Sequence, residues 1–244
     1  MDPFGVTCDP RLYVPRLGTE AALTALREGL ALGRGVSVLS GPPGLGKTMV
    51  LQVLAQQLAG TRCVLVPYAA LGIEELAHYA LDLLGERAEP ARATIALAAS
   101  ARRGALLTLL VDDASALPIP TARALREMVD SLHGALRVVA ALVDDTRASA
   151  VIAALGEHVL HVRLRHALAA SEVRDYVHGR IARAGASLSH RVLGAETIDR
   201  IAAVSAGVPR VVNTLATWLL AEDQISRSGQ RGVLFDGFET LEEA

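Results

Sequence analysis

The chain has 244 residues, of which 51% are hydrophobic and 3% aromatic, and its formal net charge at pH 7 is −2. This composition predicts a core of alanine, leucine and valine, and the near-neutral charge argues against a broad surface that binds nucleic acid of any sequence. No apolar stretch approaches the roughly 20 residues that span a bilayer, and Met1-Asp2-Pro3-Phe4 does not resemble a signal peptide. We therefore expect a cytoplasmic protein without direct membrane insertion, in which Cys8 and Cys63 stay reduced.

Residues 1–18 contain proline and glycine at short intervals and predict an extended leader, after which Thr19 is the expected N-cap of a helix to about Leu32. Short apolar strands then alternate with amphipathic helices, which predicts a three-layer α/β domain with a parallel five-stranded sheet over residues 19–166. The strands are expected at Val36–Leu39, Cys63–Val66, Leu106–Val111, Leu136–Val143 and Val159–Leu164, and the helices at Thr48–Leu58, Gly72–Leu84, Pro90–Arg102, Thr121–Leu132 and Thr146–Leu155.

Strand patterns end near His166. Three helical stretches follow, at Ser171–Ala184, Leu193–Ala203 and Pro209–Ile225, and they predict a small all-α lid domain over residues 167–225. Residues 226–244 contain three glycines and are expected to form a loose C-terminal tail.

A complete phosphate-binding loop for nucleoside triphosphates follows the first predicted strand, with the sequence Gly41-Pro42-Pro43-Gly44-Leu45-Gly46-Lys47-Thr48. Its glycines let backbone N–H groups point into one concavity, and the following helix N-terminus adds partial positive charge. We expect Lys47 to reach the β- and γ-phosphates of ATP, Thr48 to ligate Mg²⁺, and the backbone as far as Met49 to line the site. A Gly/Pro turn that merely precedes a lysine is the competing interpretation, and the exact spacing with both flanks argues against it.

Two adjacent acids, Asp112 and Asp113, follow the aliphatic strand Leu106–Val111. In a phosphate-loop enzyme the first acid at this strand end holds Mg²⁺ beside the loop threonine, and the second orients or deprotonates the attacking water. The sequence therefore predicts Asp112 as a metal-binding residue and Asp113 as a catalytic residue. A solvated turn with two aspartates is the weaker alternative.

Together with a lid that contains Gly207-Val208-Pro209-Arg210, these features resemble an AAA+ ATPase. More narrowly, the chain resembles the ExeA/GspA-type ATPases associated with bacterial secretion, and their relatives among TniB/TnsC-like transposition ATPases. The similarity lies in the leader Pro3–Tyr13, in Asp112-Asp113-Ala114-Ser115-Ala116-Leu117 and in Ala206–Asn213. It implies ATP and Mg²⁺ as cofactors, and Arg210 as a catalytic residue that touches the phosphates.

Three positions depart from this family pattern. Asp113 replaces a glutamate and is one methylene shorter, and Asp145 puts a carboxylate at a polar position where it would repel a γ-phosphate. His158 stands where the family usually has an arginine that acts across a subunit boundary, with Arg163 or Arg165 as nearby substitutes. These departures predict weak, slow hydrolysis.

The resemblance implies an ATPase that acts as a nucleotide-dependent switch, forms a homo-oligomer, and assembles or remodels a partner complex of the secretion, envelope or motility type. A DNA-associated, transposition-type regulator is the second interpretation, which the near-neutral charge disfavours. A scaffold that holds its nucleotide without hydrolysis is the third. Elsewhere, His158 and His161 are expected on one strand, at the surface or an interface, and Trp218 in the core of the lid.

Overall fold

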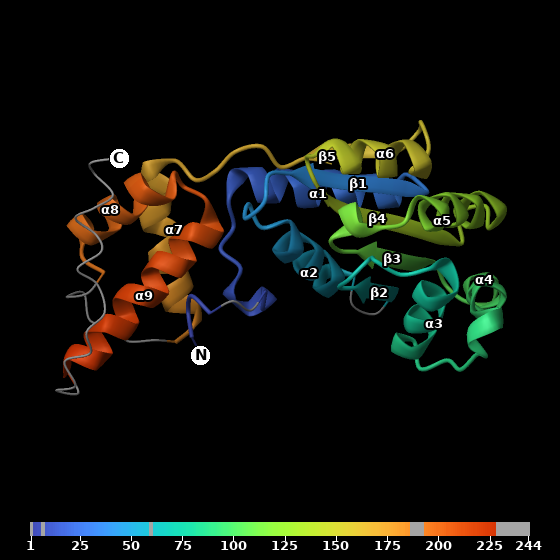
Figure 1. Ribbon diagram of the computed structural model, residues 1–244, viewed down its shortest axis with the longest axis horizontal. Coiled ribbons are helices and arrows are strands. Elements are labelled where there is room, and N and C mark those ends of the chain that lie inside the picture. Colours follow the sequence, from blue (N-terminus) through green and yellow to red (C-terminus); the bar gives the residue numbers. More distant parts are fainter. Residues whose placement is uncertain (1, 6–7, 59–60, 186–192, 228–244) are drawn as a thin grey trace. The chain divides into compact units, whose positions relative to one another are not determined.

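The computed structural model describes residues 2–5, 8–58, 61–185 and 193–227, with side chains to residue 223 (Figure 1). These residues form two compact units. An α/β unit comprises the described residues from 8 to 167, and a helical unit comprises residues 2–5 together with those from 168 onward. Most of the predicted tail, from residue 228, lies outside the described residues.

Five parallel strands form the single sheet of the α/β unit, in the order β2-β3-β4-β1-β5. This agrees with the predicted parallel sheet. Because β1 lies between β4 and β5, the loop after β1 emerges at the carboxyl edge beside both of these strands, which is where ligands bind in open α/β sheets. The strands are β1 Val36–Gly41, β2 Arg62–Val66, β3 Leu107–Val111, β4 Leu136–Val143 and β5 Leu160–Arg163.

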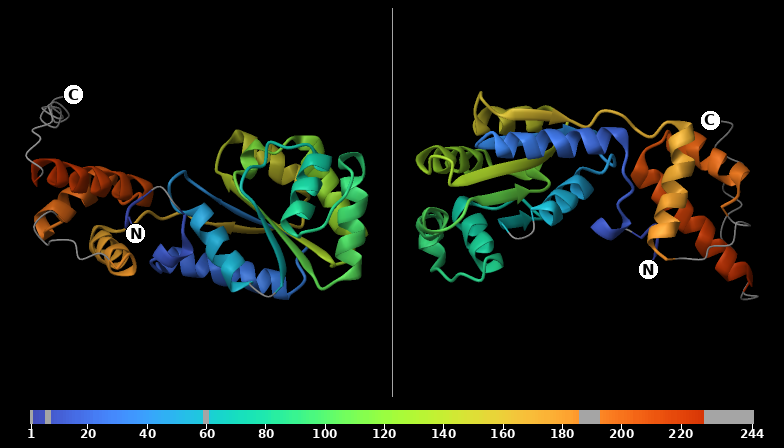
Figure 2. Two further views of the ribbon diagram at one scale, coloured as in Figure 1. Left: turned by 90° about the horizontal axis from the view of Figure 1, so that it is seen from below. Right: turned by 180° about the vertical axis from the view of Figure 1, so that it is seen from behind.

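Helices cover both faces of the sheet (Figure 2). Neighbouring residues of one strand point to opposite faces of the sheet. Leu109 packs in the hydrophobic core formed with α3 to α6, and Leu110 packs in the hydrophobic core formed with α1 and α2. Burial on both faces explains why apolar residues dominate the strands. The helices are α1 Leu17–Ala31, α2 Lys47–Gln57, α3 Ile73–Leu83, α4 Ala93–Arg103, α5 Ile119–Ser131 and α6 Thr146–Leu155.

The start of α1 differs from the expectation. Arg16 is the N-cap, and Thr19 is the third helical residue, whose hydroxyl accepts from the Arg16 N–H (3.3 Å) and donates to the Arg16 carbonyl (3.1 Å). The residues before α1 are also less extended than predicted, because Pro10–Leu12 forms a 3₁₀ turn, η1, with the Leu12 side chain fully buried. Two further 3₁₀ turns are η2 Pro90–Arg92, just before α4, and η3 Ala114–Ala116.

The helical unit consists of α7 Ala170–Arg183, α8 Ala195–Ser205 and α9 Pro209–Arg227, together with the first residues of the chain. Phe4 is buried in this unit. The buried Arg180 donates from Nε to the Pro3 carbonyl (2.6 Å), and the Thr217 hydroxyl donates to the Phe4 carbonyl (3.3 Å). The amino end of the predicted leader thus contributes to the core of the helical unit. Among the helices of the described residues, none combines the length and hydrophobicity that a membrane span requires.

Trp218 is not a core residue, contrary to the expectation, because its side chain is 53% exposed. The buried positions of α9 include Val212 and Ala216, which lie four residues apart on one face. Trp218 lies two residues beyond Ala216, about 200° further around the helix. The periodicity of the buried positions therefore places Trp218 on the opposite side.

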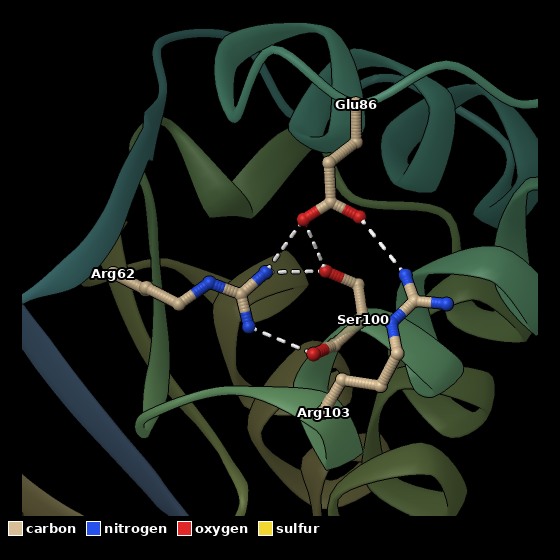
Figure 3. Close-up of polar contacts among 4 residues, drawn as sticks. All are labelled: Arg62, Glu86, Ser100 and Arg103. Carbon is tan, nitrogen blue, oxygen red and sulfur yellow. Dashed lines mark hydrogen bonds and ion pairs between the residues drawn. The ribbon is translucent and has the colours of Figure 1, made fainter.

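A polar network ties the start of β2 to the turn after α3 and to α4 (Figure 3). Arg62 donates to the Ser100 carbonyl (2.8 Å) and to Glu86 Oε1 (2.8 Å), and it also contacts the Ser100 hydroxyl. The buried Ser100 hydroxyl donates to Glu86 Oε1 (2.6 Å), and Arg103 reaches the other carboxylate oxygen (3.4 Å). Glu86 is therefore the shared acceptor of all three side chains.

Glu86→Ala should lower the free energy of unfolding by about 1–2 kcal/mol, because it leaves the Ser100 hydroxyl and two guanidinium groups without their common acceptor. Urea unfolding of the nucleotide-free protein measures this loss. Glu89→Ala, at an exposed neighbouring position, is the matched control. Equal stability of the two variants would show that the network contributes nothing.

Candidate nucleotide-binding site

The predicted phosphate loop joins the last residue of β1, Gly41, to the first residue of α2, Lys47. Gly46 is the N-cap of α2 and has φ of 95°, in the left-handed region that favours glycine. Gly41 is required for a different reason: a Cβ at this position would lie 2.2 Å from the carbonyl oxygen of Leu164. Both glycines are therefore fixed by backbone geometry.

Lys47 folds back over its own loop. Its side chain is buried, and Nζ donates to the carbonyl oxygens of Gly41 (2.7 Å) and Pro42 (2.9 Å). It is also the only lysine in the sequence. The single lysine ammonium of the chain is thus held inside the loop, where the predicted role needs it.

Asp112 lies at the end of β3, close to this loop. Its backbone N–H donates to the Val66 carbonyl (2.8 Å), which fixes the acid at the carboxyl edge of the sheet. Burial raises the pKa of the Asp112 carboxyl, while hydrogen bonding with the Thr48 hydroxyl and the positive charge of Lys47 lower it. Three of the predicted residues therefore lie together, and a carboxylate beside a hydroxyl is a donor set that fits Mg²⁺.

Asp113 is exposed and has φ of 48°. Aspartate tolerates this left-handed conformation better than most residues, since its short polar side chain bonds locally. The left-handed backbone therefore gives a structural reason for aspartate at position 113, where the resembling family has glutamate. The turn leads directly into η3.

Ser115 connects the segment after β3 to the end of β4, a contact that sequence reasoning missed. Its buried hydroxyl accepts from the Val143 N–H at 2.9 Å. Ser115 belongs to no catalytic His–acid arrangement in the sequence, and nothing else in the sequence signals this role. The bond holds the segment that carries the two acids against the strand end that precedes Asp145.

The Asp145 carboxylate has a structural role as the N-cap of α6. One of its oxygens accepts from the Ala148 N–H at 2.7 Å, where the partial positive charge of the helix end also favours an anion. The expectation considered only its repulsion of a γ-phosphate. An aspartate immediately before a predicted helix was the sequence signal for this cap.

His161 is half-buried, and its predicted position at the surface or an interface stays a prediction. Its Nε2 lies 2.8 Å from the hydroxyl of the fully buried Ser40, which directly precedes Gly41. Burial, followed by the positive charges of Arg163 and Arg165, lowers the pKa of His161. The neutral imidazole is therefore favoured beside the phosphate loop.

His158 and His161 do not share a strand, contrary to the expectation. His158 lies in the turn that precedes β5, whereas Arg163 is the last residue of β5 and pairs in register with Ser40 of β1. Arg163 thus belongs at the same sheet edge as the phosphate loop of its own chain, and His158 at the opposite edge. There, His158 lines a hollow of about 270 Å³ with Arg34, Arg126 and His133 among other residues.

Arg210 is exposed in the first turn of α9, in the helical unit. The preceding Gly207 has a packing role: a Cβ there would lie 1.9 Å from the Leu168 carbonyl oxygen, and the Leu168 N–H donates to the Gly207 carbonyl (2.8 Å). The predicted contact between Arg210 and nucleotide phosphates stays a prediction.

Comparison with known proteins supports this assignment of the loop. Residues 31–148, a stretch that contains the phosphate loop and both acids, match the family model described as "AAA domain". The sequence matches no curated protein.

Several solved structures share the fold. RuvB of Thermotoga maritima, a Holliday junction branch migration motor, matches with a TM-score of 0.58 and 16% identity, and the match covers 97% of this chain and 70% of the RuvB chain. A Walker-type ATPase of Pyrococcus abyssi matches with a TM-score of 0.64 and 11% identity, over 94% of this chain and 74% of the ATPase chain. The ORC1 protein of Aeropyrum pernix in complex with DNA matches with a TM-score of 0.62 and 19% identity, over 88% of this chain and 62% of the ORC1 chain. Together, the match of residues 31–148 to the AAA-domain model and the similarity to these solved structures show that the α/β unit has the αβα fold of P-loop AAA+ ATPases.

Proposed function

We propose that this protein binds ATP with Mg²⁺ at the phosphate loop and acts as a slowly hydrolysing switch for the assembly of a homo-oligomer with a partner complex. The observation that carries the proposal is the convergence of Lys47, Thr48 and Asp112 at one sheet edge. These residues come from two segments more than sixty positions apart, and they form a cation and a metal-binding pair around a glycine-rich backbone.

Each residue has a distinct role in this proposal. Lys47 neutralises charge on the β- and γ-phosphates, and Thr48 with Asp112 holds Mg²⁺, which when bound neutralises the charge that develops on the transferred phosphoryl group. Asp113 orients the attacking water, and Arg210 contacts the phosphates from the helical unit. Burial raises the pKa of Asp112, and a cation bound beside this carboxyl would lower it.

The switch follows from differential binding. A nucleotide shifts a conformational equilibrium only as far as it binds one state better than the other, and the γ-phosphate is the difference between ATP and ADP. Arg210 would sense that group, because it is exposed and lies on a separate unit. The resemblance to ExeA/GspA-type ATPases supports a secretion, envelope or motility partner.

Light scattering of the apo, ADP-bound and ATP-analogue-bound protein tests the switch. We expect monomers or small species without nucleotide and a larger homo-oligomer with a non-hydrolysable ATP analogue. Arg210→Ala should bind nucleotide but assemble poorly, whereas Arg200→Ala, at an exposed position of α8, should assemble normally. The same mass in all three states would contradict the switch and favour the permanently bound scaffold.

DNA is the alternative partner, favoured by the shared fold with RuvB, a Holliday junction branch migration motor, and with ORC1, which was solved in complex with DNA. If DNA is the partner, the oligomer should form on duplex DNA and lose affinity steeply between about 50 and 200 mM salt. Fluorescence anisotropy of a labelled duplex measures this directly.

A further inference from the structure

Arg16, the residue that precedes α1, contacts the phosphate loop 29 residues further along the chain. Its Nη2 donates to the carbonyl oxygen of Leu45 at 2.7 Å. A Cβ at position 46 would lie 3.3 Å from the same nitrogen. The guanidinium group therefore lies against the peptide that joins Leu45 to Gly46.

This contact fixes the orientation of the peptide. A trans peptide is planar, so its carbonyl oxygen and the N–H of the next residue point in opposite directions. The bond from Arg16 holds the Leu45 carbonyl towards the guanidinium, and the Gly46 N–H consequently points away from it. Glycine accepts either sign of φ, which means that the backbone of Gly46 alone would not select this orientation.

Arg16 is itself held in place. Its backbone forms the reciprocal pair with Thr19 at the start of α1, and the Tyr13 hydroxyl donates to the same threonine oxygen at 2.7 Å. Thr19 is buried, so the anchor of the arginine backbone is sheltered from water. The side chain therefore starts from a fixed point beside the loop.

We propose that Arg16 is a positioning residue that orients the Gly46 N–H towards a bound phosphate by holding the Leu45 carbonyl, and that its positive charge adds to the attraction of the loop for phosphate. This inference rests on the proposed nucleotide binding. Arginine suits the role because its guanidinium stays charged and presents several donors in a fixed plane.

Calorimetry with two ligands, ATP and inorganic pyrophosphate, tests the role of Arg16. We expect Arg16→Ala to bind each about tenfold more weakly, since a charge-assisted hydrogen bond and the order of the loop are lost. Pyrophosphate has no base or sugar, so an equal loss for both ligands locates the effect at the phosphate site. Arg16→Lys keeps the positive charge but loses the planar guanidinium with its several donors, so its affinity for both ligands should lie between those of the wild type and Arg16→Ala.

Two controls separate positioning from folding. Arg27→Ala, at an exposed position on α1, should leave both affinities unchanged. Free guanidinium at non-denaturing concentration should restore part of the affinity of Arg16→Ala, an effect that a general loss of structure would not produce. Thermal unfolding of the apo proteins confirms that each variant is folded.

The possible results distinguish this inference from the proposed function. A wild-type protein that does not bind ATP would remove the proposed function, and the inference with it. A wild-type protein that binds, combined with an Arg16→Ala variant that matches Arg27→Ala, would overturn the inference alone. A loss for ATP without a loss for pyrophosphate would also overturn it, because Arg16 would then act on the nucleoside.

Discussion

Replacing Lys47 with alanine is expected to weaken ATP binding by about a hundredfold or more. The substitution removes the ammonium that would contact the phosphates, and it also leaves the carbonyls of Gly41 and Pro42 without the donor that holds them at 2.7 and 2.9 Å. Isothermal titration calorimetry in the presence of Mg²⁺ measures the change. Both effects act at the loop, so the apo protein should keep its fold.

The sequence offers a second, independent readout of this site. Because Lys47 is the only lysine, an amine-directed reagent can modify only this side chain and a free amino terminus. We expect ATP to protect Lys47 from modification, as mass spectrometry of the labelled peptides would show. Arg27→Ala is the matched control, with unchanged affinity and unchanged protection. Unaltered ATP affinity in Lys47→Ala would remove the basis of the proposed function.

Hydrolysis by the wild-type protein is expected to be slow, below the ~1–100 s⁻¹ of typical kinases. Asp112→Asn should abolish it, because the site loses the anion that holds the metal. Asp145→Asn should increase it severalfold, because asparagine caps a helix as well as aspartate does but carries no charge to repel the γ-phosphate. Asp113→Glu should maintain or increase the rate. Phosphate release with saturating ATP measures all four proteins.

Asp145→Ala separates the charge effect from the capping effect. It removes both the charge and the bond to the Ala148 N–H, and should therefore cost about 0.5–2 kcal/mol of stability in addition to any gain in rate. Rapid hydrolysis by the wild-type protein would contradict the proposal that Asp113 and Asp145 slow the reaction. If wild-type turnover is rapid and collapses in Asp113→Glu, the site is tuned to aspartate and to the left-handed conformation that Asp113 adopts.

The contact of His161 was missed by sequence reasoning, and the position of Trp218 was predicted wrongly. A histidine on a short strand gives no sign of its partner, because Ser40 lies 121 residues away and becomes a neighbour only through the pairing of β5 with β1. The sequence predicts a core position for Trp218 because Leu215 and Leu219 lie nearby on the same helix. Its place depends on which face of α9 the rest of the helical unit buries, and that face carries Val212 and Ala216.

The sequence by itself determined the features that are encoded within a few consecutive residues. Short, mainly apolar stretches predicted the five strands. The pattern from Gly41 to Thr48 predicted the phosphate loop, because backbone torsional freedom and the direction of the N–H groups are set by neighbouring residues of the chain. The position of Asp112 directly after a buried strand was likewise predicted from consecutive residues. None of these predictions required knowing which other segments pack against the strand or the loop.

Only the tertiary structure decided what surrounds these elements. The strand order β2-β3-β4-β1-β5 brings Leu164 against Gly41, and the packing of α1 beside α2 and β5 accompanies the contact of Arg16 with Leu45. Such contacts depend on which segments the burial of apolar surface brings together, and no single segment contains that information. The residues of the loop were therefore predictable, and the groups that hold the loop in shape were not.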